Sequence, residues 1–206
     1  MHPFDFDAGT EVIQGNDRDY WNFIENNYLH LCANQKVLEV GPFRGNHTKI
    51  ITKHKPSYLE CIEANADCKE SLERINGINK IVIDDVWLQT EKRQFDIVIC
   101  FGVLYHHHSP LYLLELFVNC YNPKYIMLDC VNAGNPLSYL PEPVNSPGYR
   151  YLRDGWKNCG MNFNPPFFII NQSMSHMGYK IKLSHKLETS YMPKSNSWTA
   201  LWEQEE

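Results

Sequence analysis

The stretch VLEVGPFRGNHT, residues 37–48, decides the fold because its pattern changes in the middle. It opens as an apolar run interrupted only by Glu39, which is typical of a strand covered on both faces of a sheet. Gly41 and Gly45 follow, and glycines permit a tight turn and a close approach of the backbone to a ligand. The next residues open a helix, whose N-terminus offers free N–H groups. This order predicts a ligand-binding turn between a strand and a helix.

The spacing of these glycines argues against a nicotinamide dinucleotide. That fingerprint needs glycines at positions 41, 43 and 46, where the chain has Gly41, Phe43 and Asn46. Glu39 would also repel a pyrophosphate, whereas a carboxylate there suits a cationic ligand. An NAD-dependent oxidoreductase is therefore a weak alternative.

Along the whole chain, apolar runs alternate with helical segments, as in an α/β domain. Strands are predicted at 36–40, 58–63, 80–84, 96–101 and 125–129. Helices are predicted at about 46–55, 65–76, 110–121 and 166–177. The third of these should start with the capping hydroxyl of Ser109, followed by Pro110, which loses no hydrogen bond at a first helical position.

The last part of the chain predicts an antiparallel hairpin, because segments 179–190 and 195–204 alternate like strands around the turn-rich YMPKSN. The fold class is therefore α/β, with a mostly parallel seven-stranded sheet, a C-terminal hairpin and helices on both faces. Residues 131–165 are rich in proline and predict a lid or cleft wall. We expect an arm and a helix over residues 1–34 and a single domain over residues 35–206.

Composition narrows the class of partner. The net charge of −5 and the lack of any basic run disfavour a nucleic-acid substrate, without excluding one. No signal pattern and no membrane-length apolar stretch is visible, so we expect a cytoplasmic protein with no membrane partner. The seven cysteines form no CxxC pair and are expected to be reduced thiols. Homo-oligomerisation is left open.

The run of three histidines at 106–108 raises the question of a metal site. Consecutive histidines cannot all face one ion on regular backbone, and reliable metal signatures take ligands from one face or from separate elements. We therefore predict no metal. A turn that links a strand to a helix is the plain interpretation of His107 and His108.

The glycine turn resembles the first motif of the class I S-adenosylmethionine-dependent methyltransferases, an acidic residue followed by glycines two, four and six positions on. The match is Glu39, Gly41 and Gly45, with Phe43 in place of the middle glycine. Glu63 in LECIEAN, 18 residues beyond Gly45, resembles the second landmark of these enzymes. The segment IVIDDVW (81–87) resembles the third landmark.

Further segments resemble one subgroup, the tRNA wobble-uridine carboxymethyltransferases. GVLYH (102–106) before a Ser-Pro helix start looks similar to the fourth landmark of that subgroup. GYRYLRDGW (148–156) and MGYKI (177–181) resemble its distal half. The resemblance spans about residues 35–204 and implies one Rossmann-like methyltransferase domain.

The resemblance also implies roles for single residues. Glu39 would help to place the amino end of the cofactor S-adenosylmethionine, and Glu63 would accept both ribose hydroxyls. Of the adjacent pair Asp84 and Asp85, the second is assigned to the adenine amino group. The remaining cofactor-binding residues are Gly41, Phe43, Gly45, Val86, whose backbone would lie beside the adenine ring, and Phe101. The candidate bases are His106 and, as second choice, Asp129.

The predicted function is methyl transfer from S-adenosylmethionine to a hydroxyl or amine of a small molecule by direct displacement. Aligning the reacting atoms in a dry cleft supplies most of such catalysis, so few catalytic residues are needed. Two alternatives stay open. One is methyl or carboxymethyl transfer to tRNA, and the other is a non-catalytic cofactor-binding subunit of a complex.

Overall fold

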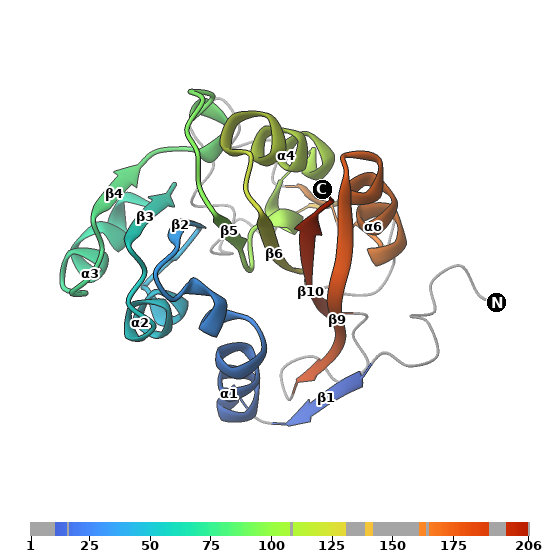
Figure 1. Cartoon of the computed structure of the whole chain (residues 1–206), viewed down its shortest axis with the longest axis horizontal. Helices are drawn as coiled ribbons and strands as arrows, with labels where there is room; N and C mark the ends of the chain where they lie inside the picture. The colour runs from blue at the N-terminus through green and yellow to red at the C-terminus, as the bar shows by residue number, and fades with distance from the viewer. Residues whose placement is uncertain are drawn as a thin grey trace.

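The computed structural model describes residues 11–15, 17–107, 109–130, 139–141, 161–163, 165–189 and 197–205. An eight-stranded sheet runs through the molecule in the order β1-β9-β10-β6-β5-β2-β3-β4 (Figure 1). All its neighbouring pairs are parallel except those that β10 makes with β9 and β6. The order turns back between β2 and β5, and in open α/β sheets ligands bind near such a point at the carboxyl ends of the strands.

The strands of the sheet are β1 (Glu11–Gly15), β2 (Lys36–Val40), β3 (Tyr58–Glu63), β4 (Lys80–Ile83), β5 (Ile97–Cys100), β6 (Tyr125–Cys130), β9 (Tyr179–Thr189) and β10 (Ser197–Gln204). All seven predicted strands are present, and the mostly parallel sheet with a C-terminal hairpin is confirmed. The sequence analysis missed β1, which adds an eighth strand by pairing parallel to β9. A separate two-stranded sheet joins β7 (Tyr139–Pro141) to β8 (Met161–Phe163).

The helices are α1 (Asp17–Asn27), α2 (Asn46–Lys53), α3 (Lys69–Glu73), α4 (Pro110–Leu116) and α6 (Phe167–His176). Shorter turns are η1 (Leu29–Cys32), η2 (Ala66–Cys68), η3 (Val86–Leu88), η4 (Leu104–His106) and the π-helical η5 (Phe117–Tyr121). Ser109 is the N-cap of α4, but its hydroxyl makes no capping hydrogen bond, so that expectation was wrong. Its backbone N–H instead donates to Nδ1 of His107, 3.0 Å away. No helix of the described part is long and apolar enough to cross a membrane.

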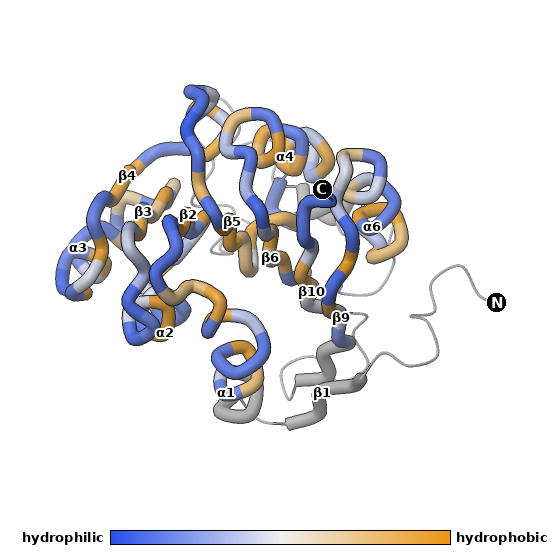
Figure 2. The backbone as a smooth tube through the Cα atoms, in the orientation of Figure 1, coloured by the Kyte–Doolittle hydropathy of each residue, from blue (hydrophilic) through white to orange (hydrophobic). Residues whose placement is uncertain are grey.

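Two apolar clusters cover the two faces of the sheet. One joins alternate strand residues such as Val98 to α4 and α6, and the other joins the intervening residues such as Ile97 to α1 and α2. This alternation places helices on both faces, as predicted. Figure 2 shows the resulting pattern, with hydrophobic strands inside and hydrophilic turns outside.

The hairpin edge is tied to the N-terminal part of the chain by a buried tyrosine. The hydroxyl of Tyr28 lies 2.9 Å from Nδ1 of His185 on β9 and donates to the carbonyl of Thr199 on β10, 3.3 Å away. This contact fixes α1 and η1 against the sheet, although they precede its central strands in the sequence. The predicted boundary between residues 34 and 35 stays a prediction. Most of the predicted lid at 131–165 lies outside the described residues, except β7, β8 and Pro165.

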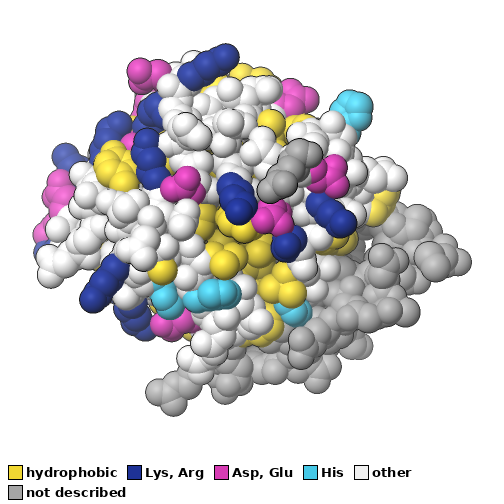
Figure 3. Space-filling model, viewed as in Figure 1, with side chains coloured by type: hydrophobic (Ala, Val, Ile, Leu, Met, Phe, Trp, Pro, Cys, Tyr) yellow, Lys and Arg dark blue, Asp and Glu magenta, His cyan; other side chains and the backbone are white. Residues whose placement is uncertain are grey.

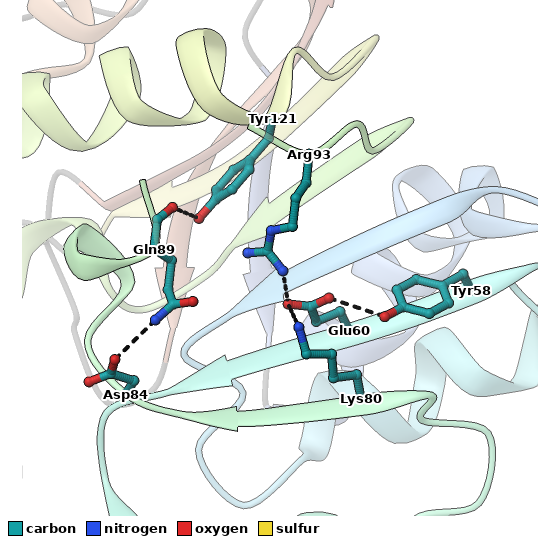
Figure 4. A network of polar contacts seen from close by, with 7 residues as sticks. All are labelled: Tyr58, Glu60, Lys80, Asp84, Gln89, Arg93 and Tyr121. Atoms are coloured by element: carbon teal, nitrogen blue, oxygen red, sulfur yellow. Dashed lines mark hydrogen bonds and ion pairs between the residues drawn. The ribbon is translucent and has the colours of Figure 1, made fainter. Parts of the chain in front are cut away.

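A buried carboxylate holds the outer strands together on the side away from the glycine turn. Glu60 on β3 is 2% exposed, and it pairs with Arg93, with Lys80 at 3.4 Å and with the hydroxyl of Tyr58 at 3.2 Å (Figure 4). The guanidinium of Arg93 also lies over the Phe95 ring. Since a buried carboxylate is costly unless it is paired, Arg93 should matter to stability more than the half-exposed Lys80 does.

We predict that Arg93→Met lowers the free energy of unfolding by about 3 kcal/mol, because it leaves Glu60 buried without its main partner. Lys80→Met, the matched control, should cost less than about 1 kcal/mol. Adding Glu60→Leu to Arg93→Met should restore most of the loss. Urea unfolding followed by circular dichroism measures all three, and equal losses for Arg93→Met and Lys80→Met would contradict the prediction.

Candidate functional site

A pocket of about 540 Å³ opens at the carboxyl ends of the central strands. Its volume lies within the range of roughly 300–1,000 Å³ that small-molecule sites occupy. Its walls come from β2 and β3, from the segments that follow β2, β3, β4 and β5, and from α1 and α2. The lining residues are Trp21, Val40–Arg44, Asn46, His47, Ile62–Ala64, Asp84–Trp87, Phe101–Val103 and Tyr105–His107. Of the ten predicted site residues, the pocket collects Gly41, Phe43, Glu63, Asp85, Val86, Phe101 and His106.

The glycine turn is left-handed at both of its glycines, and both also serve packing within the protein. Gly41 has φ +68° and Gly45 has φ +80°. A Cβ on Gly41 would collide with the Val103 side chain, and one on Gly45 would collide with Ile75. The missing Cβ atoms therefore make room for Val103 and Ile75, and the approach of a ligand to Gly41, which lines the pocket, stays a prediction.

Phe43 takes the place of the middle glycine of the motif, and its backbone is also left-handed, with φ +52°. This conformation costs a residue with a side chain roughly 1–2 kcal/mol. The Phe43 N–H donates to Oε2 of Glu63 over 2.7 Å, which helps to hold the turn in this conformation. The ring is 42% exposed and lines the pocket.

Glu63, at the end of β3, is the carboxylate that accepts the Phe43 N–H of the glycine turn. Its second oxygen, Oε1, accepts the N–H of Asn65 over 2.8 Å, and the residue is 5% exposed. Burial raises the pKa of Glu63, and the N–H groups of Asn65 and Phe43 oppose that rise. A carboxylate oxygen has two acceptor positions, so each oxygen can take one further hydroxyl from a ligand in the pocket.

Asp84 and Asp85 both line the pocket, but they have different surroundings. The side chain of Gln89 donates to Oδ2 of Asp84 over 3.0 Å, as Figure 4 shows. Gln89 is itself held through its carbonyl, which accepts the Tyr121 hydroxyl over 2.8 Å. Asp85 precedes η3, where Val86 is 6% exposed beside the pocket. Both carboxylates line the pocket, and the choice of Asp85 as the residue that meets a ligand stays a prediction.

Glu39 does not reach the pocket. It is 2% exposed and lies behind the glycine turn, where it accepts the hydroxyl of Thr48 over 2.7 Å and the thiol of Cys61 over 3.6 Å. Any effect of Glu39 on a ligand must therefore pass through the turn. Burial raises its pKa from 4.5 to about 7, against the lowering effect of the Thr48 and Cys61 hydrogen bonds.

The two candidate bases are placed differently. His106 ends η4 and lines the pocket, with its ring centre 4.3 Å from that of Tyr105. Asp129 is 7% exposed, is not among the lining residues, and its carboxylate accepts the N–H of Gly102. His107 is buried against Trp87, and His108 lies outside the described residues. Within the described part of the chain, no group of three or more His, Cys, Asp or Glu could hold a metal.

Sequence reasoning missed three aromatic lining residues, namely Trp21, His47 and Trp87. Trp21 belongs to α1, far from the recognised motifs in sequence, and only the packing of α1 brings it to the pocket. His47 lies at the second position of α2, directly after the glycine turn, so its place in the motif was the one available signal. Trp87 ends the recognised IVIDDVW segment.

We predict that Glu39 lowers the free energy of unfolding by roughly 2–3 kcal/mol between pH 5 and pH 8, and that Glu39→Gln removes this contribution. Buried His47, whose pKa is lowered, contributes in the opposite direction in both proteins. The folded-state pKa of about 7 lies above the unfolded value of 4.5, so the contribution of Glu39 is full below pH 4.5 and is lost as the pH rises through 7. Urea unfolding of both proteins at pH 5 and pH 8 measures it. Parallel pH profiles would contradict a protonated Glu39.

No protein-family model and no curated protein matches the sequence. Solved structures do match the fold. The N-methyltransferase NodS from Bradyrhizobium japonicum WM9, in complex with S-adenosyl-L-homocysteine, gives a TM-score of 0.68 at 12% identity, covering 93% of this chain and 89% of that chain. Burkholderia thailandensis 1,6-didemethyltoxoflavin-N1-methyltransferase gives 0.68 at 11% identity, covering 92% and 78%.

A third similar structure is magnesium protoporphyrin IX methyltransferase from Synechocystis PCC 6803 with bound S-adenosylmethionine, at a TM-score of 0.63 and 10% identity. It covers 91% of this chain and 79% of that chain. At such identities the likeness concerns the fold. The chain has the Rossmann-like fold that these methyltransferases share, with its pocket at the carboxyl ends of the central strands.

Proposed function

We propose that the protein transfers a methyl group from S-adenosylmethionine to a small-molecule acceptor. The proposal rests on the position of Glu63. This buried carboxylate lines the pocket and accepts a hydrogen bond from the Phe43 N–H of the glycine turn. Two oxygens with spare acceptor positions match the two hydroxyls of a ribose. The neighbouring solved structures bind S-adenosylmethionine or S-adenosylhomocysteine, which supports the same cofactor here.

The other lining residues fit the remaining parts of this cofactor. Asp85 can accept the adenine amino group beside Val86, and Phe43 and Phe101 offer apolar surface. The first turn of α2, which begins after Gly45, presents free N–H groups that suit a carboxylate. Glu39 would act from behind the turn. The cofactor supplies an activated methyl group on a positively charged sulfur.

The acceptor nucleophile needs a base only if it is a hydroxyl. His106 is our proposal for that role, because it lines the pocket and imidazole titrates near neutral pH. Asp129 stays the second choice, since the Gly102 N–H occupies its carboxylate behind the wall of the pocket. The small-molecule acceptors named for the neighbouring structures support a small acceptor here.

A second candidate is methyl or carboxymethyl transfer to tRNA. It is favoured by the likeness of GVLYH and the Ser109–Pro110 helix start to the tRNA wobble-uridine subgroup. The net charge of −5 counts against it. The face in Figure 3 also intersperses acidic and basic side chains, whereas a phosphate backbone would require a basic tract. A cytoplasmic location and a non-catalytic role in a complex likewise remain proposals.

We predict that the protein binds S-adenosylmethionine and S-adenosylhomocysteine but not NAD, and that Glu63→Ala weakens both by at least about tenfold through lost hydrogen bonds. Glu73→Ala, an exposed carboxylate on α3 away from the pocket, is the matched control and should change nothing. Calorimetric titration measures all of these affinities. Unchanged binding in Glu63→Ala would remove Glu63 from the site, and tight NAD binding would overturn the cofactor.

A second prediction concerns His106. With a hydroxyl acceptor found by screening phenols, amines and bulk tRNA against labelled S-adenosylmethionine, His106→Asn should lower kcat by about 100-fold or more. Its cofactor affinity should stay unchanged. Asp129→Asn should retain more turnover than His106→Asn does. The reverse ranking would make Asp129 the base, and turnover with tRNA alone would favour the second candidate function.

A further inference from the structure

Three aromatic rings from separate elements meet at one end of the pocket. Trp21 from α1 and His47 from α2 have ring centres 4.4 Å apart, and His47 and Phe101 at the end of β5 have ring centres 5.1 Å apart. All three residues line the pocket. We call Trp21, His47 and Phe101 the aromatic wall.

The charged residues that line the pocket come from other segments than the three rings do. Among the described lining residues they are Arg44, Glu63, Asp84 and Asp85, from the turns after β2, β3 and β4. Arg44 lies near Cys68, before α3, where its charge acts to lower the pKa of the thiol. In the sheet order β5-β2-β3-β4, Phe101 follows β5, whereas the three carboxylates follow β3 and β4.

The aromatic wall also carries no positive charge near neutral pH. Burial lowers the pKa of His47 to about 3, so its imidazole is neutral. Because the His47 imidazole is neutral, the aromatic wall acts on a ligand mainly through the negative faces of its aromatic rings. Such ring faces attract a cation, and they are less strongly hydrated than a carboxylate is.

We propose that the aromatic wall binds the positively charged sulfonium of the methyl donor, and thereby makes the protein prefer the donor to its neutral thioether product. This inference rests on the proposed function, which assigns the adenosine to Glu63 and Asp85. The sulfonium end then extends toward β2 and β5, where the wall lies. Trp21 is the residue we single out, because indole has the strongest attraction for a cation among the aromatic side chains.

The preference follows from the charge balance of the reaction. When the methyl carbon bonds to the acceptor, the carbon–sulfur bond breaks and its electron pair stays on sulfur. The sulfonium becomes an uncharged thioether, and the acceptor proton leaves to a base or to water. The aromatic wall then loses its attraction for the ligand, so the product dissociates more easily than a donor would.

The test compares the affinities of donor and product in Trp21→Leu. We expect S-adenosylmethionine to bind about three- to tenfold more weakly, while S-adenosylhomocysteine changes less than about twofold. Sinefungin, which carries an ammonium near the sulfonium position, should weaken as the donor does. Trp21→Phe keeps an aromatic face and should give a donor-to-product ratio closer to that of the unmodified protein. Tyr112→Leu, an exposed ring on α4 outside the pocket, is the matched control.

The outcomes separate this inference from the function on which it rests. Equal weakening of donor and product in Trp21→Leu would overturn the inference and reduce the wall to packing or to an acceptor surface, with the cofactor assignment intact. Failure of the unmodified protein to bind either ligand would overturn the proposed function, and the inference with it. Circular dichroism checks the folding of each variant, and Trp21→Phe decides the matter if Trp21→Leu unfolds.

Discussion

The pair of hydrogen bonds that Glu63 accepts from Phe43 and Asn65 is the interaction on which the site depends. The bond from Phe43 joins the end of β3 to the turn after β2 and helps to hold Phe43 in a backbone conformation that a residue with a side chain seldom adopts. The bond from Asn65 fixes the carboxylate at the end of β3. The same carboxylate faces the pocket. One side chain therefore supports the turn and presents acceptors to a ligand, so Glu63→Ala removes both kinds of hydrogen bond.

The central parallel strands could be predicted because they are buried on both faces. The runs at β2 and β3 are mostly apolar and are buried along nearly their whole length, and their predicted bounds match the structure. β1 was missed because its sequence, EVIQG, holds only two apolar residues and its partner, β9, lies near the other end of the chain. Ser109 and Pro110 do start α4, but the Ser109 hydroxyl makes no capping hydrogen bond, and nothing in the structure explains its absence.

Site residues that directly follow a strand could be predicted from the sequence. Site residues that reach the pocket through the packing of a distant helix could not. Glu63, Asp85 and His106 end strands or open the next turns, so the topology collects them at one edge. Glu39 ends up behind the turn because Thr48 and Cys61 take its carboxylate. Trp21 reaches the pocket only because Tyr28 and His185 fix α1 and η1 to the hairpin edge, a contact between residues 157 positions apart.

The most direct test of the central claim is a crystal structure of the chain grown with saturating S-adenosylhomocysteine. We predict that the ligand occupies the pocket, with its ribose hydroxyls on Glu63, its adenine beside Asp85 and Val86, and its sulfur toward Trp21 and Phe101. A ligand bound elsewhere, or one in this pocket without contact to Glu63, would contradict the assignment of the site.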